Sequence, residues 1–280
     1  MSTDSARHKR RLLPGFGLTL GITLTLLSVV VLLPLTLLVL RAAEMSWEEF
    51  KVAAFSRRAL SAYRVSFVTA LAAAVLVTVS GTLVAWVLER YDFPGRRALD
   101  ALVDLPFALP TAVAGIALTA LYGPTGPIGV PLEAMGIKVA YTHIGITLAL
   151  AFVGLPFVVR TVQPVLEELE PELEEAAACL GATRMQTVVR VLFPALQPAL
   201  IAGFALAFAR GVGEYGSVIF IAGNLPMKTE IAPLLVVIRL EEFDYQGAAA
   251  IASVMLAGSF AALALVHFAS VKLRRAMEAT

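Results

Sequence analysis

Long apolar runs recur along the chain with few charges inside them. Five runs without an acidic or basic residue extend over 17–40, 65–88, 105–131, 139–159 and 247–271. A sixth, over 195–225, is interrupted only by Arg210 and Glu214. An α-helix needs about 20 apolar residues to cross a hydrocarbon core about 30 Å thick. We therefore predict an all-α polytopic membrane protein with six transmembrane helices.

Composition supports a chain surrounded by lipid. Hydrophobic residues make up 59% of the 280 residues and charged residues 15%, whereas soluble domains average about 25% charged. The net charge of +1 provides no bulk attraction to nucleic acid, so no nucleic-acid partner is expected. The single cysteine, Cys179, excludes an intrachain disulfide framework.

The basic residues predict the orientation. A basic flank over 7–11 precedes the first apolar run, which is longer than the roughly 7 to 15 residues of a signal peptide, so we interpret it as a retained anchor. Placing the N-terminus inside leaves thirteen Lys and Arg residues in cytoplasmic segments and seven outside. The positive-inside rule then predicts that both termini are cytoplasmic. Cytoplasmic tails at 1–16 and 272–280 would flank one transmembrane domain at 17–271.

Several kinds of chemistry are excluded. No two of the three histidines have metal-ligand spacing, and no GxxxxGK[ST] motif is present, so we expect no catalytic residue, no metal site and no nucleotide site in this chain. Gly211, Gly213 and Gly216 match the dinucleotide pattern GxGxxG, but their apolar run is too long for the strand that this pattern requires. We interpret these glycines as positions of close helix packing.

The longest polar cytoplasmic segment, residues 167–194, has the pattern of a helix-turn-helix. Six glutamates between 167 and 175 precede a patch of small residues, and Gly181 is able to adopt the left-handed conformation that closes a helix. Apolar residues at helical spacing then predict a second helix that ends at Pro194. A tip of alanine and glycine would enter a groove on another protein; the alternative is a solvated acidic loop.

The details of this segment resemble a known motif. Glu175-Ala176-Ala177, then Gly181 after three residues, then Val191-x-Phe193-Pro194 resembles the EAA motif of ABC importer permeases. The usual ending is Ile-x-Leu-Pro, so two positions depart conservatively. The resemblance implies contact with a partner ATPase through Glu175, Ala176, Ala177, Gly181, Val191, Phe193 and Pro194.

Other segments narrow the resemblance. Residues 105–115, 159–169, 213–224 and 239–245 are similar to the T-type permeases of bacterial sulfate and thiosulfate importers. The resemblance implies the type I ABC importer permease fold in a bacterial inner (plasma) membrane, and a role in moving sulfate or thiosulfate into the cytoplasm. It also implies a homologous W-type permease subunit, two ATPase subunits that hold ATP and Mg, and a periplasmic sulfate-binding protein. The chain itself would be non-catalytic and without a cofactor.

Charges within the membrane mark the translocation path that this resemblance implies. Arg210 and Glu214 lie four residues apart near the middle of the 195–225 run, which is the fifth along the chain, so we expect them to share a helix face. Together with Tyr215 and Ser217 they are candidates for the path of the anion. The favoured interpretation is a structural ion pair, because an arginine neutralised by a glutamate attracts sulfate weakly. Asp104 is interpreted as a residue at a helix start.

Three alternatives remain open at this point. The same kind of importer could carry molybdate or tungstate instead of sulfate. A self-sufficient secondary carrier would need no ATPase, and a membrane-embedded hydrolase would need a nucleophile and a base at membrane depth. Neither of the last two explains the cytoplasmic helix-turn-helix.

Overall fold

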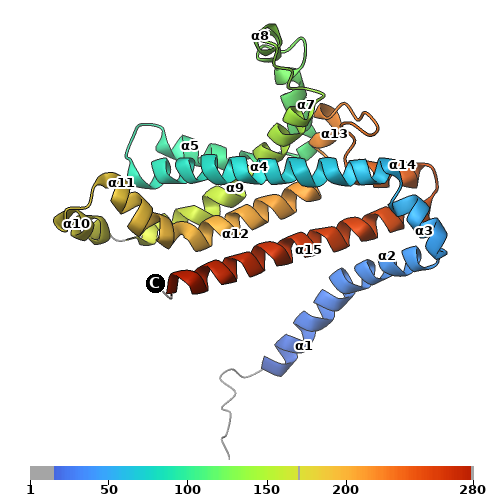
Figure 1. The fold of residues 1–280 in the computed structure, drawn as a ribbon, viewed down its shortest axis with the longest axis horizontal. Coiled ribbons are helices and arrows are strands. Elements are labelled where there is room, and N and C mark those ends of the chain that lie inside the picture. Colours follow the sequence, from blue (N-terminus) through green and yellow to red (C-terminus); the bar gives the residue numbers. More distant parts are fainter. Residues whose placement is uncertain (1–15, 170, 279–280) are drawn as a thin grey trace, which may run out of the picture.

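The computed structural model describes residues 16–169 and 171–278, and within these ranges every regular element is helical (Figure 1). The first half contains α1 (Phe16–Leu27), the π-helical turn η1 (Ser28–Leu32), α2 (Leu33–Ala43), α3 (Trp47–Ala54), α4 (Arg57–Arg90), α5 (Arg96–Val103), α6 (Leu105–Ala108), α7 (Thr111–Tyr122) and α8 (Gly129–Ala134). The second half contains α9 (His143–Glu168), α10 (Pro171–Cys179), α11 (Arg184–Thr187), the π-helical turn η2 (Val188–Leu192), α12 (Phe193–Val212), α13 (Val218–Ile221), α14 (Ala232–Glu241) and α15 (Tyr245–Glu278). The all-α prediction is confirmed.

Five of the six predicted spans occur as helices that are long and apolar enough to cross a membrane. These helical stretches cover Phe16–Ala43, Arg57–Arg90, His143–Glu168, Arg184–Val212 and Tyr245–Phe268. The helix of the last span continues to Glu278, beyond the predicted domain end at 271. The predicted tail at 1–16 lies, apart from its last residue, outside the described residues.

The third predicted span, over 105–131, is not a single helix. Leu109 and Pro110 are extended, with ψ of 136° and 130°, and separate α6 from α7. The cause is Pro110, which has no backbone N–H and disfavours helical geometry at the residue before it. The 12 residues of α7 measure about 18 Å, which is shorter than a hydrocarbon core. The third predicted span is therefore divided and contains no helix long enough to cross the membrane by itself, and α7 projects from the bundle with α8 at its tip (Figure 1).

Both π-helical turns precede a proline and keep a helix continuous through it. The N–H of Leu33 donates to the carbonyl of Ser28, and the N–H of Phe193 donates to that of Val188, each five residues back. Pro34 and Pro194 follow directly. A normal α-turn would bring the proline ring against the carbonyl four residues earlier, and the wider turn moves that carbonyl away.

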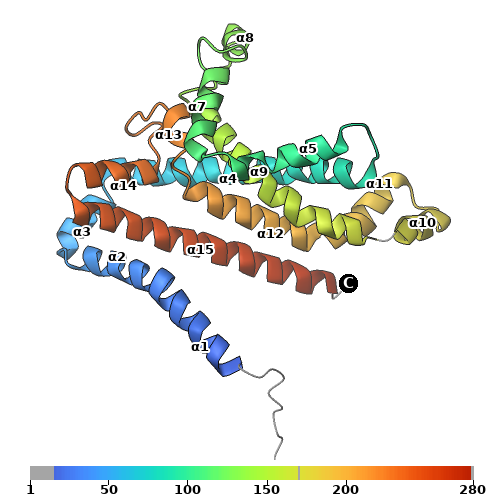
Figure 2. The same cartoon turned by 180° about the vertical axis from the view of Figure 1, so that it is seen from behind.

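The core consists of α4, α9 and α12, which lie side by side (Figures 1 and 2). Glycines allow their backbones to approach closely. A Cβ atom on Gly81 would lie 3.0 Å from Val158 Cγ1, and one on Gly203 would lie 3.1 Å from Val158 Cα. Between α9 and α12, a Cβ on Gly154 would touch that of Ala207 at 3.5 Å. Small residues at such positions are how membrane helices gain packing contacts without a hydrophobic driving force.

The peripheral helices surround this core unevenly. α15 packs against α14, α2 and α12. The apolar run of α1, η1 and α2 has no buried residue in its most apolar stretch, and α1 diverges from the bundle (Figure 2). The fold places α10 and α11 at one end of the long helices and α3 and α14 at the other end (Figures 1 and 2).

The α3 end is fastened by a buried ion pair. Arg58 at the start of α4 donates from Nε and Nη2 to the two carboxylate oxygens of Glu230, at 2.8 and 2.6 Å. Glu230 lies in the loop before α14 and its side chain is only 1% exposed. A bidentate guanidinium satisfies a carboxylate that water does not reach.

Replacing Arg58 by alanine would leave this carboxylate buried and unpaired. We expect Arg58→Ala to lower the free energy of unfolding in detergent by about 3 kcal/mol, the cost of breaking a buried ion pair. Arg41→Ala breaks the exposed Arg41–Glu44 pair and should cost less than about 1 kcal/mol. Chemical denaturation of the two variants measures the difference, and equal losses would contradict a dominant role for burial.

Candidate functional site

The predicted turn after α10 is present and Gly181 forms it. Gly181 has φ of +81°, and the N–H of Ala182 donates to the carbonyl of Ala177 at 3.0 Å. The N–H of Gly181 donates to the carbonyl of Ala178 at 2.9 Å. This pair of bonds is a Schellman motif, which satisfies the last carbonyls of a helix and reverses the chain. A side chain at Gly181 would meet no neighbour but would force an L-residue into the left-handed region.

The second limb of the turn begins with a capping box. Gln186 N–H donates to Thr183 Oγ1 at 3.3 Å, and Thr183 N–H donates to Gln186 Oε1 at 2.8 Å. The prediction that this limb ends at Pro194 is wrong, because α11, η2 and α12 form one helical stretch from Arg184 to Val212. The π-helical turn accommodates the proline, so the limb leads directly into the fifth span.

We call residues 171–187 the elbow. It carries most of the residues with the EAA pattern, and the rest follow it in η2 and α12. Glu175, Ala176 and Gly181 are exposed, Ala177 is buried beneath them, Val191 and Pro194 are half-buried and Phe193 is exposed.

The elbow and the turn that follows it present apolar side chains outward. The side chains of Leu180 and Met185 are 89% and 72% exposed, and Val189 and Phe193 are also exposed. Cys179 lies exposed beside them. Large exposed apolar groups gathered on one surface are typical of a protein interface.

A polar network lies at the same end of the bundle, and Arg160 of α9 is its centre. Its guanidinium donates to both carboxylate oxygens of Asp104, to the carboxylate and carbonyl of Asp100, and to Gln163 Oε1. Arg160 holds the pKa of the Asp100 carboxyl below its ordinary value. The Asp100 carboxylate therefore stabilises the folded chain fully above the ordinary pKa of an aspartate, and this contribution is lost as the pH falls through the lowered pKa.

Sequence reasoning missed this network. Asp104, which the sequence suggested as a helix-start residue, makes no capping hydrogen bond, and its carboxylate binds Arg160 instead. The sequence does contain a signal of the network, because the spacing of Asp100 with Asp104 and of Arg160 with Gln163 places each pair on one helix face. The sequence does not reveal that these two faces meet.

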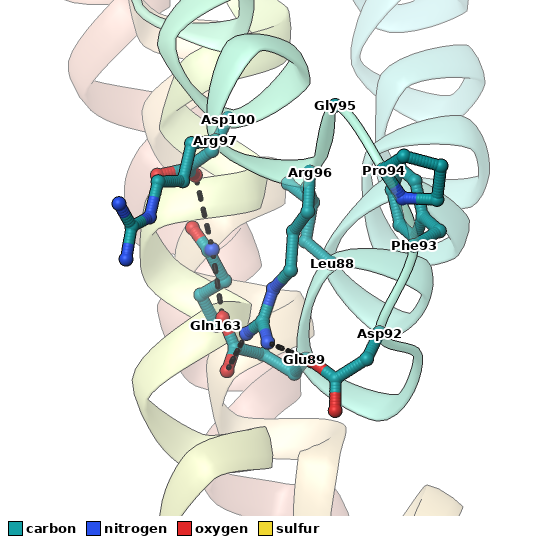
Figure 3. Close-up of a pocket in the computed structure, with 10 residues that line it drawn as sticks. All are labelled: Leu88, Glu89, Asp92, Phe93, Pro94, Gly95, Arg96, Arg97, Asp100 and Gln163. Carbon is teal, nitrogen blue, oxygen red and sulfur yellow. Dashed lines mark hydrogen bonds and ion pairs between the residues drawn. The ribbon is translucent and has the colours of Figure 1, made fainter.

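Next to the network lies an open pocket of about 780 Å³ between the end of α4 and the start of α5 (Figure 3). Arg96 lies between Glu89 and Asp92, with nitrogen–oxygen distances of 3.5 and 3.1 Å, whereas Arg97 points away (Figure 3). Within the described residues, no group of three His, Cys, Asp or Glu side chains is placed to hold a metal ion. The ion pair of Arg96 with Glu89 joins the start of α5 to the end of α4 beside this pocket.

The predicted translocation residues lie in the last turn of α12 and in the loop that follows it. Arg210 Nη1 lies 2.5 Å from Glu214 Oε2, so the two charges do pair. α12 ends at Val212, however, so Glu214 lies in a loop and the expectation of a shared helix face is wrong. Buried Glu214 also accepts from the N–H and hydroxyl of Ser217, at 2.9 and 3.1 Å. Tyr215 is half-buried beside them.

Close packing explains Gly211 at the end of α12 and Gly216 in the loop, but the same interpretation of Gly213 is wrong, because no atom lies within 4 Å of a Cβ placed there. A Cβ on Gly216 would lie 2.2 Å from Thr111 Oγ1, and one on Gly115 would lie 2.3 Å from the carbonyl oxygen of Ser217. Gly211 packs against Ala70 of α4, where a Cβ would lie 3.3 Å from the alanine Cβ. Close packing, and not a dinucleotide loop, thus accounts for Gly211 and Gly216.

Comparison with known proteins adds to this geometry. Residues 79–275 match the family described as binding-protein-dependent transport system inner membrane component. The chain belongs to this family. Its match begins in α4 and includes the elbow, the Arg160 network and the Arg210–Glu214 pair.

Individual relatives cover nearly the whole chain. The sulfate transport system permease protein CysT of Escherichia coli (strain K12) is 54% identical over 254 residues, which is 91% of this chain and 92% of that protein. The protein of the same description from Synechocystis sp. is 49% identical over 88% of this chain and 86% of its own.

Solved structures share the fold at low identity. A chain of the bacterial alginate ABC transporter, crystallised with an alginate-bound periplasmic protein, aligns with a TM-score of 0.75 at 16% identity, over 92% of this chain and 94% of that one. A chain of the inward-facing MetNI methionine ABC transporter aligns with a TM-score of 0.54 at 18% identity, over 83% and 99%. The type I permease fold of such transporters is thus the fold of this chain.

The elbow should depend on Gly181 for its shape. Gly181→Val places a β-branched residue at positive φ, at a cost of about 1–2 kcal/mol, and should open the turn. We expect faster tryptic cleavage after Arg184 in detergent. Gly213→Ala is the matched control, since Gly213 has φ of −91° and open space around it. Equal cleavage of both variants and the parent would contradict the role assigned to Gly181.

Proposed function

We propose that this chain is the T-type transmembrane permease subunit of an ATP-driven importer that moves sulfate or thiosulfate into the cytoplasm. The observation that carries the proposal is 54% identity to a sulfate transport permease across 91% of the chain. The motif segments of the elbow and of the loop after α12 lie within residues 79–275, which match the family.

The proposed assembly contains several other proteins. A homologous W-type permease subunit would complete the pore, two ATPase subunits would hold ATP and Mg, and a periplasmic binding protein would deliver the anion. This chain would supply no cofactor and no catalytic residue. The elbow would lie in the cytoplasm together with both termini, in the orientation that the distribution of basic residues favours.

The elbow would couple ATP hydrolysis to transport. The exposed Leu180 and Met185 would be covered by the ATPase, and the small residues around Gly181 would allow close contact. Because the helical stretch Arg184–Val212 is continuous, a displacement of the elbow would move its far end, about 43 Å away. Alternating access would follow from that movement.

The Arg210 loop, by which we mean residues 213–217 after α12 together with Arg210, would lie along the path of the anion. Glu214 neutralises Arg210, which prevents tight retention of a dianion, and the Arg210 side chain remains 37% exposed. Tyr215 would line the same region. Ser217 is fully buried and donates to Glu214, so its part would be to hold that carboxylate in place.

Reconstitution tests the proposal. Proteoliposomes that contain the chain, its permease partner and the ATPases, supplied with the binding protein, should accumulate radiolabelled sulfate with ATP and not without the ATPases. Gly181→Val should insert normally into the membrane and lose uptake. Inhibition of sulfate uptake by a small excess of molybdate or tungstate would favour those anions as the substrate. Accumulation by the chain alone, driven by an ion gradient, would contradict the proposal in favour of a secondary carrier.

A further inference from the structure

The last turn of α4 is where the elbow meets the rest of the bundle. Arg90 Nη2 lies 3.3 Å from Glu174 Oε1 of α10. Among the described residues, this is the only ion pair or side-chain hydrogen bond that joins the elbow to another helix. The chain itself provides the other two connections, from α9 into α10 and from α11 through η2 into α12.

The Arg90–Glu174 pair is loosely bonded. The Arg90 guanidinium lies over the ring of Trp86 at 5.6 Å, and its Nε and Nη2 are buried without a hydrogen-bond acceptor in the described part of the chain. Charge and the aromatic ring therefore hold Arg90, rather than directional hydrogen bonds. Arg160 is the opposite case, because five hydrogen bonds fix its position between α5 and α9.

Glu89, the residue before Arg90, connects the last turn of α4 to α9 and α5. Glu89 accepts a hydrogen bond from Gln163 of α9 at 2.8 Å and pairs with Arg96 of α5 (Figure 3). Gln163 in turn donates to Asp100, which Arg160 binds. The end of α4 thus lies between a loose contact to the elbow and a firm network on α9 and α5.

We propose that Arg90 is a positioning residue that transmits elbow movement to α4, and through Glu89 to α5, as a route beside the two covalent ones into α9 and α12. The inference rests on the proposed function. A loosely bonded ion pair tolerates a change of geometry while keeping its attraction, since Coulomb energy falls slowly with distance and a hydrogen bond fails sharply with angle. It therefore joins two helices that shift relative to each other.

The measurement is the ratio of sulfate imported to ATP hydrolysed by the reconstituted complex. We expect Glu174→Gln and Arg90→Gln each to lower this ratio about tenfold, within the usual range of coupling between sites, while ATP hydrolysis continues. Glu172→Gln removes a neighbouring exposed charge of α10 and should leave the ratio unchanged. A merely structural pair would lower import and hydrolysis together.

Exchanging the two charges tests whether the effect on the ratio depends on the Arg90–Glu174 pair or on each residue separately. The double variant Arg90→Glu with Glu174→Arg should recover more of the ratio than either single variant. An unchanged ratio in Glu174→Gln, whose side chain is 35% exposed and tolerant of substitution, would overturn the proposal, as would an exchange variant no better than the single variants. Absence of sulfate import by the unmodified complex would instead contradict the proposed function.

Discussion

A helix carries a displacement along its axis when it is continuous, and the stretch from Arg184 to Val212 is continuous although Pro194 and Pro198 donate no backbone hydrogen bond. The π-helical turn Val188–Leu192 makes that possible, because its wider geometry removes the clash between the proline ring and the preceding turn. The exposed elbow and the Arg210 loop therefore lie at opposite ends of one continuous helical stretch. The coupling that we propose between an ATPase and the path of the anion depends on that continuity.

The surroundings of this element differ between its middle and its ends. In the middle, glycines such as Gly203 allow α12 to pack tightly against α9. At the elbow end, polar and charged groups replace small residues, and these contacts range from the firmly bonded Arg160 to the loosely bonded Arg90. Apolar packing is dense and has few alternative arrangements, whereas ion pairs near a water-exposed end exchange partners at lower cost. Movement is thus more easily accommodated where the polar contacts lie.

The sequence predicts those features that depend on neighbours along the chain. Apolar runs locate five spans, and Gly181 with the small residues before it locates the elbow. It does not predict features that depend on which helices become neighbours: the contact of Asp104 with Arg160, or the place of Glu214 in a loop. Pro106 and Pro110 signal the division of the third span, whereas hydropathy alone gives one continuous apolar run. A proline in an apolar run is compatible with a kink, a π-helical turn or a break, and tertiary packing decides among them.

The central claim is that the elbow faces the cell interior and is covered by an ATPase there. The single cysteine, Cys179, lies exposed in the elbow and reports on this directly. A membrane-impermeant maleimide applied to vesicles of opposite orientation, with and without bound ATPase, is the most direct measurement. The account predicts labelling only in inside-out vesicles and protection when the ATPase is bound. Labelling from the outer face, or equal labelling with and without the ATPase, would contradict it.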